Sequence, residues 1–133
     1  MGVRCYQDLV AWQLANELKR KVYELIDNSS TRVDLRFRDQ IRASASSAPT
    51  NIADGFGYYR HPDFARFVRI ARAELSETHC HLGDGVDRRY WSKEEAEELR
   101  QLANRAVGAT TGLLRYLMTT EAPQKWPKRS PSR

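Results

Sequence analysis

Four stretches of the sequence repeat apolar residues every three or four positions, the spacing that places them on one face of an α-helix. The first stretch runs from Asp8 to Ile26, the second begins near Leu35, the third opens at His61, and the fourth follows Ser92. No stretch shows the alternation of a half-buried strand. Four amphipathic helices with short connections predict an all-α fold, an antiparallel up-down four-helix bundle.

Size and composition predict one bundle followed by a tail. The chain has 133 residues, 41% of them hydrophobic, which suits a single core spanning 1–121. No apolar run approaches the roughly 20 residues that cross a bilayer, and the N-terminus lacks a signal-peptide pattern, so we expect a cytosolic protein. Two cysteines, Cys5 and Cys80, are too few for a disulfide framework and are expected to be reduced thiols.

The excess positive charge is concentrated at the C-terminus. The formal net charge is +5, and the segment 122–133 holds four of the 22 basic residues and none of the 17 acidic ones. This Pro-rich segment is predicted to be disordered. Its bases Lys125, Lys128 and Arg129 are candidates for contact with a nucleic-acid backbone, and a purely solubilising end is the equal alternative.

Local signals around Pro49 predict how the second helix ends. A proline inside a helix removes one backbone hydrogen bond and predicts a kink, with nearby serine hydroxyls serving the loosened backbone. Those hydroxyls belong to Ser44, Ser46 and Ser47. Gly55 and Gly57 are predicted to end the helix, next to Asp54. Asn51 is expected to satisfy backbone groups of the turn, a structural role that we favour over ligand binding.

The third and fourth helices carry clear start signals. Pro62 suits a first helical turn, and Asp63 is favourable beside the positive end of the helix dipole. The apolar pattern lapses over 83–91, which predicts a connection there. Ser92 and Glu95 then form a capping box that predicts the start of the fourth helix.

Small and apolar residues outside the core stripes predict an oligomer interface. Gly108 and Gly112 fall on the outer face of the fourth helix, where each costs about 1 kcal/mol relative to alanine, which suggests close approach of another backbone. Ile70 and Ala73 also lie outside their stripe, and Leu14 belongs to an unusually broad apolar face of the first helix. Scattered surface apolar residues are the alternative interpretation.

Arginines on the second and third helices predict a nucleic-acid-binding face. The candidates, joined by one tyrosine that could stack on unpaired bases, are Arg38, Arg42, Tyr59, Arg60, Arg66 and Arg69. A solvated face balanced by the acidic residues of 94–98 is the equal alternative.

With the helices placed, one combination of residues is distinctive: Asp8, Leu9, Trp12, Gln40, Ile41, Ser47, Pro49, Asn51, Ile52, Ala53, Gly55, Phe64, Phe67, Ala71 and Glu77. In this combination the chain resembles the bacterial 23S ribosomal RNA intervening sequence proteins over roughly Asp8 to Leu117. Asp54 stands where the family usually has Glu, and Ala73 with Glu74 replaces a usual Gly-Ser.

The resemblance implies a cytosolic bundle that assembles as a ring-like homopentamer without established catalytic residues. A related branch, the accessory proteins of diversity-generating retroelements, is similar to a basic pentamer that binds nucleic acid and a reverse transcriptase. The resemblance therefore implies RNA or DNA, and a reverse transcriptase, as partners.

Enzyme and metal readings receive little support from the sequence. Arg72 and His79 lie seven positions apart on one helical face, similar to HEPN-type ribonucleases, but Ala73 replaces the polar residue usually found there. Glu77, His79, Cys80 and His81 lack a second Glu-x-x-His on another helix, so no metal or other cofactor is predicted.

The sequence thus favours a non-enzymatic, homo-oligomeric bundle that binds RNA or DNA through a basic surface, as accessory to a larger machine such as a reverse transcriptase. No membrane and no small-molecule substrate are predicted as partners. The alternatives are a scaffold whose partners are all proteins and a HEPN-like ribonuclease using Arg72 and His79.

Overall fold

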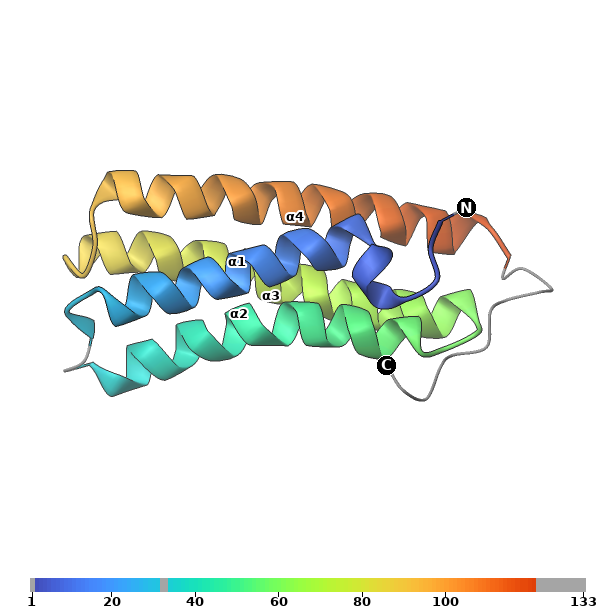
Figure 1. The fold of residues 1–133 in the computed structure, drawn as a ribbon, viewed down its shortest axis with the longest axis horizontal. Helices are drawn as coiled ribbons and strands as arrows, with labels where there is room; N and C mark the ends of the chain where they lie inside the picture. Colours follow the sequence, from blue (N-terminus) through green and yellow to red (C-terminus); the bar gives the residue numbers. More distant parts are fainter. Residues whose placement is uncertain (1, 32–33, 122–133) are drawn as a thin grey trace.

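The computed structural model, which describes residues 2–31 and 34–121, is a bundle of four long helices (Figure 1). The elements are η1 (Tyr6–Asp8), α1 (Val10–Asp27), α2 (Leu35–Phe56), α3 (His61–Asp87) and α4 (Lys93–Thr119). No strand occurs in those two described stretches. The α1–α2 and α3–α4 connections lie at one end of the molecule, and the α2–α3 connection lies at the other (Figure 1). The predicted all-α helical bundle is confirmed.

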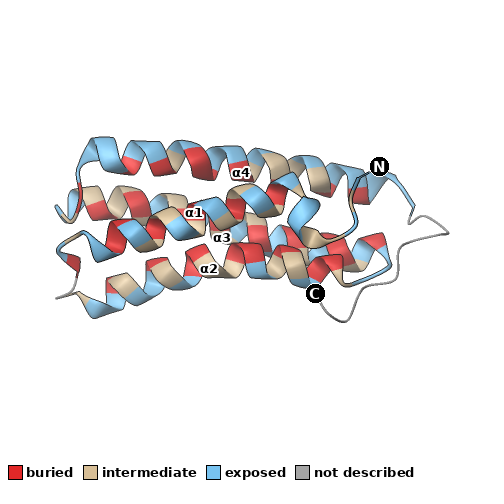
Figure 2. Cartoon of the chain, viewed as in Figure 1, coloured by how far each residue is buried: buried red, intermediate tan, exposed pale blue. Residues whose placement is uncertain are grey.

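The core lies between the helices, on the inward faces that carry the buried residues (Figure 2). The broad apolar face of α1 packs against both α2 and α4, so its width is accounted for by two neighbours within the chain. Leu14, a predicted interface residue, is half-buried at the edge of this core. No helix in the described part of the chain is long and apolar enough to cross a membrane. The predicted tail, 122–133, lies outside the described residues.

Polar side chains around Pro49 bond to carbonyls within α2. Pro49 lies inside the helix, which continues to Phe56. The Ser44 and Ser46 hydroxyls donate to carbonyls three residues back, at 3.1 and 3.2 Å, and neither of these is the Ala45 carbonyl that the proline leaves without its usual partner. The Asn51 amide donates to the Ser47 carbonyl, 2.9 Å away, one turn earlier in the helix. This bond lies within the helix rather than at the following turn, where the partner of Asn51 was expected.

Gly55 does not end α2, contrary to the prediction. It lies inside the helix and is buried, whereas Gly57 follows as the C-cap. A Cβ on Gly55 would lie 2.7 Å from Phe67 Cβ and 2.8 Å from Phe64 Cδ1, both on α3. The glycine therefore allows close approach of α2 and α3, while the adjacent Asp54 side chain is exposed.

The third helix is longer than predicted, and Gly85 in its last turns serves packing instead of ending the helix. α3 continues to Asp87 through Gly85, which lies beneath the indole of Trp91. The Trp91 Nε1 donates to the Leu82 carbonyl at 2.8 Å, which holds the ring in place. The predicted capping box at the start of α4 is confirmed, with Glu95 N donating to Ser92 Oγ at 3.0 Å and Ser92 N donating to Glu95 Oε1 at 2.8 Å.

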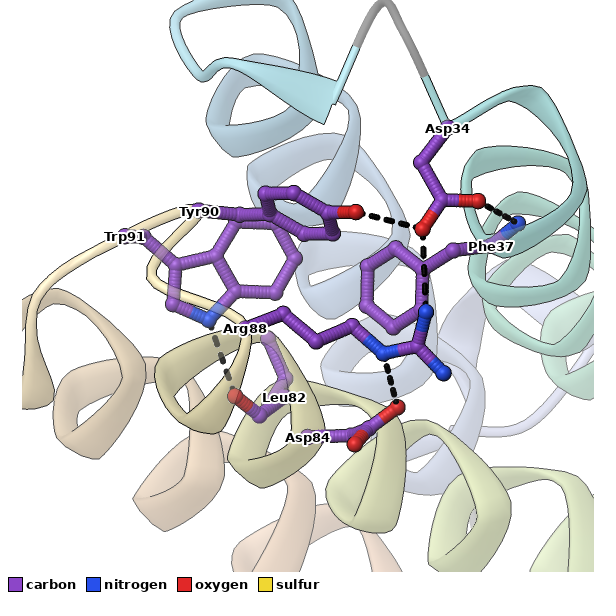
Figure 3. A network of polar contacts seen from close by, with 7 residues as sticks. All are labelled: Asp34, Phe37, Leu82, Asp84, Arg88, Tyr90 and Trp91. Atoms are coloured by element: carbon purple, nitrogen blue, oxygen red, sulfur yellow. Dashed lines mark hydrogen bonds and ion pairs between the residues drawn. The ribbon is translucent and has the colours of Figure 1, made fainter.

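A polar network ties the start of α2 to the α3–α4 connection (Figure 3). Asp34 caps α2 by accepting from Phe37 N at 3.2 Å, and it also accepts from the Tyr90 hydroxyl. Arg88 bridges Asp34 and Asp84, donating to each carboxylate at 2.9 Å. We call Asp34, Asp84, Arg88 and Tyr90 the loop clasp. It lies at the end of the bundle away from the α2–α3 connection.

Candidate nucleic-acid interface

The predicted arginines fall into two groups, one on α2 and one on the α2–α3 connection and α3. Arg38 and Arg42 lie near the start of α2, whereas the other three follow its end, in the α2–α3 connection and the first half of α3. At 1.5 Å per residue, the 14 residues from Arg42 to Phe56 span about 21 Å. Arg38 and Arg42 are therefore separated from Arg60 by most of the length of α2.

The arginines on α2 contact side chains of α1. Arg38 Nη2 lies 3.8 Å from Asp27 Oδ1, and the Arg42 guanidinium carbon lies 5.8 Å from the centroid of the Tyr23 ring. Both contacts hold α2 beside α1. Binding of nucleic acid by Arg38 and Arg42 stays a prediction.

The second group, which we call the basic end, consists of Arg60, Arg66 and Arg69. All three side chains are exposed. Among residues 2–31 and 34–121, none of them forms an ion pair with a carboxylate, unlike Arg38 and Arg88. Their positive charge is therefore not neutralised by an ion-paired acid in the described part of the chain.

Aromatic rings lie among these arginines. The Tyr58 ring stacks on Phe67 at a centroid distance of 5.1 Å, and the Arg66 guanidinium carbon lies 4.8 Å from the centroid of the same Phe67 ring. Phe67 itself is half-buried. Tyr58 and Tyr59 remain 44% and 46% exposed. Guanidinium groups and exposed rings together are typical of surfaces that bind single-stranded nucleic acid.

An open pocket of about 630 Å³ adjoins the basic end. It is lined by Tyr59, Arg60, His61, Pro62, Ala65, Arg69, Leu117, Met118, Thr120 and Glu121. The pocket thus forms where the start of α3 meets the end of α4. Sequence reasoning missed the contribution of α4, although Met118, an exposed apolar residue outside the core stripe, was a signal for it.

His61 fixes one wall of this pocket. The side chain is buried, and its Nδ1 donates to the Thr120 carbonyl at 2.9 Å, since a carbonyl can only accept. Its ring also lies against Tyr116, at a centroid distance of 5.4 Å. The end of α4 is thereby attached to the start of α3.

Four of the predicted interface residues lie along the α3–α4 side of the bundle. Ile70 and Ala73 are exposed on α3, and Gly108 and Gly112 are exposed on α4. A Cβ on either glycine would meet nothing within 4 Å in the single chain. The two helices are bridged at this level by Arg72 Nη1, which donates to Thr111 Oγ1 at 3.4 Å. Leu14 on α1 is the exception, because it packs against the core.

Arg72 and His79, the two residues of the ribonuclease alternative, are both half-buried. Arg72 is engaged with α4 through Thr111, as described above. Burial, and then the charge of Arg100, lower the pKa of His79, so that its imidazole is neutral at neutral pH. Among the residues that the structure describes, no three His, Cys, Asp or Glu side chains gather as a metal site would require.

Comparisons with known proteins agree with this architecture. The family model described as 23S rRNA-intervening sequence protein matches residues 7–112. A crystal structure of a protein with unknown function, from the S23 ribosomal protein family of Bacteroides thetaiotaomicron, superposes with a TM-score of 0.71 at 18% identity, covering 80% of this chain and 99% of that one. No curated protein matches the chain. The chain belongs to the 23S rRNA-intervening sequence protein family.

Proposed function

We propose that this protein is a non-enzymatic, antiparallel up-down four-helix bundle that forms a homopentamer and binds RNA or DNA through its basic end. The observation that carries the proposal is the exposure of Arg60, Arg66 and Arg69 without an ion-paired carboxylate among the described residues. A phosphate that binds there displaces water and counterions, and no ion pair of the protein has to break. At Arg88, in contrast, a phosphate would compete with two carboxylates.

Assembly would multiply this charge. Several copies joined through the α3–α4 side would present several basic ends to one strand, and linked weak contacts bind far more tightly than single ones. The basic residues Lys125, Lys128 and Arg129 follow Glu121, which lines the pocket at the same end. These bases would add further phosphate contacts. Such a protein would serve as accessory to a larger nucleic-acid machine, for example one containing a reverse transcriptase.

Replacing the three arginines tests the proposal. In Arg60→Gln/Arg66→Gln/Arg69→Gln, the slope of log affinity against log salt concentration should become shallower by about 2 to 3, because each lost phosphate contact removes about one unit. The measurement is fluorescence polarisation of a labelled RNA or DNA oligonucleotide over a salt series. The matched control is Arg20→Gln/Arg36→Gln/Arg105→Gln, which removes the same charge from exposed positions elsewhere and should keep most of the slope.

A scaffold that binds only proteins is the second candidate, favoured by the exposed apolar side chains beside the basic end, of which Met118 is 62% exposed. Truncation after Glu121 distinguishes the two, because it removes four basic residues. A nucleic-acid binder should weaken, whereas a scaffold should retain its partner. Absence of binding even at low salt, or tight binding that ignores salt, contradicts the nucleic-acid proposal.

A further inference from the structure

We infer that the pocket between the start of α3 and the end of α4 accepts one unpaired base, so that the ligand of the basic end is single-stranded nucleic acid. The inference rests on the proposed function and adds what that function leaves open, the class of nucleic acid. The volume, lining and charge of the pocket support it.

The volume and lining of the pocket suit a flat, partly apolar ligand. About 630 Å³ falls in the range of roughly 300 to 1,000 Å³ that small-molecule sites occupy. Ala65, Leu117 and Met118 supply apolar surface, and Tyr59 supplies an aromatic ring at the side of the α2–α3 connection. A nucleobase combines a π-face that stacks on such a ring with an edge that prefers to remain hydrated, and an open pocket allows both.

The charge of the pocket selects an anionic ligand. Two arginines of the basic end, Arg60 and Arg69, line it, against one carboxylate among the lining residues, Glu121. Arg69 Nη2 donates to Met118 Sδ at 3.6 Å, so this guanidinium lies at the apolar wall rather than away from it. A nucleotide whose base contacts Tyr59 and Met118 therefore has a guanidinium within reach of its phosphate.

The two sides of the pocket, the start of α3 and the end of α4, are joined to each other without a ligand. The bond from His61 to the Thr120 carbonyl and the packing of His61 on Tyr116 join α3 to α4 at the pocket. A wall that is already ordered lowers the entropic cost of binding. Base pairing opposes entry, because a base stacked inside a duplex must first be extruded at a cost of a few kcal/mol. Unpaired strands are therefore favoured over duplexes of equal charge.

Two ligands with the same number of phosphates separate base recognition from charge. The first is an oligothymidine of about 12 nucleotides, and the second is an abasic sugar-phosphate chain of the same length. The full-length protein should bind the oligothymidine about tenfold more tightly, and more tightly than a duplex of that length, as measured by fluorescence polarisation. Tyr59→Ala should reduce the affinity for oligothymidine about tenfold while leaving the affinity for the abasic chain unchanged.

Tyr58→Ala is the matched control, because Tyr58 is equally exposed but does not line the pocket. It should preserve the preference for bases. Thermal unfolding of both variants checks that each folds.

Other outcomes have distinct meanings. Equal affinity of the wild type for the two chains, with the salt dependence described above, overturns the base-binding inference and leaves the proposed function intact. Failure to bind either chain or the duplex at low salt overturns the proposed function itself. Tighter binding of oligothymidine after truncation beyond Glu121 identifies the tail as the occupant of the pocket and also overturns the inference.

Discussion

At the scale of single residues, the glycines inside the helices of this bundle differ in what surrounds them. A Cβ on Gly85 would lie within 3.0 Å of three indole atoms of Trp91, and one on Gly55 would meet two phenylalanines of α3. A Cβ on Gly83 would make an ordinary contact, 3.5 Å from the Arg100 guanidinium carbon. The absence of a side chain is thus required at Gly55 and Gly85 and optional at Gly83.

Gly85→Ala and Gly83→Ala should consequently have opposite effects on stability. Gly85→Ala should lower the free energy of unfolding by about 1 to 3 kcal/mol, because the indole is held by its bond to Leu82 and cannot withdraw without losing it. Gly83→Ala, two positions away in the same helix, should raise the free energy of unfolding by up to about 1 kcal/mol, because alanine has the higher helix propensity. Urea unfolding at one fixed protein concentration measures both. A neutral Gly85→Ala would show that the Trp91 contact is loose.

At the scale of helices, most of what is observed could be predicted, because apolar periodicity and capping signals act locally. The capping box of Ser92 and the start of α3 near Pro62 are of this kind. The end of α3 could not be predicted, because Gly85 resembles a stop signal until Trp91 is known to lie on it. Gly55 was misinterpreted for the same reason, since the contact that explains it comes from another helix. Glycines at helix contacts and glycines at helix ends have the same sequence signature.

The loop clasp joins elements in a charge-dependent way. The Tyr90 hydroxyl, the Phe37 amide and the Arg88 charge lower the pKa of Asp34, against a smaller opposing effect of burial. A carboxyl group whose pKa is lowered by folding stabilises the fold above its ordinary value of 3.8, and the contribution is lost as the pH falls from there through the lowered value. The ionised clasp therefore contributes fully at neutral pH.

Asp34→Asn should lower the thermal unfolding midpoint at neutral pH. Asparagine caps a helix nearly as well as aspartate, so the loss comes chiefly from the bonds to Arg88 and Tyr90. The difference from the wild type should shrink as the pH falls from 3.8 through the lowered pKa, because the wild-type carboxyl group then becomes protonated and, like asparagine, uncharged. Asp39→Asn, at an exposed position further along α2, should show a much smaller difference. A difference for Asp34→Asn that persists at low pH would assign its effect to capping instead of charge.

At the scale of the whole molecule, the two ends of the bundle differ in how their charges are used. At the clasp end, Arg88 is paired with carboxylates, whereas at the other end Arg60, Arg66 and Arg69 are not paired within the described chain. The ion pairs at the clasp end join the start of α2 to the α3–α4 connection, whereas the arginines at the other end are available to a polyanion. The ends are separated by the length of the helices, so binding at one need not disturb the other.

The part of the candidate site that comes from neighbouring positions in the sequence could be predicted, and the part that comes from another helix could not. Tyr59 and Arg60 are adjacent, and Arg66 and Arg69 follow on the same helix, so their grouping follows from the sequence alone. The apolar wall supplied by Leu117 and Met118 required knowing that α4 ends beside the start of α3. The distance of Arg38 and Arg42 from Arg60 depends on α2 continuing through Pro49, where the sequence predicted a kink.

Assembly through the α3–α4 side is tested by filling the space above Gly108. A Cβ there meets nothing within 4 Å in the single chain, so Gly108→Leu should leave the protomer folded and raise its helix propensity. If copies meet at this face, the leucine blocks their approach and the mass from light scattering falls toward that of one chain, 15.4 kDa. Asp39→Leu, which introduces the same side chain at an exposed position of α2 outside the predicted interface, should leave the assembly intact. A wild-type mass of one chain would contradict oligomerisation itself. An assembly unaffected by Gly108→Leu would show that copies meet at another face. The number of basic ends that reach one strand would then depend on the geometry of that other interface.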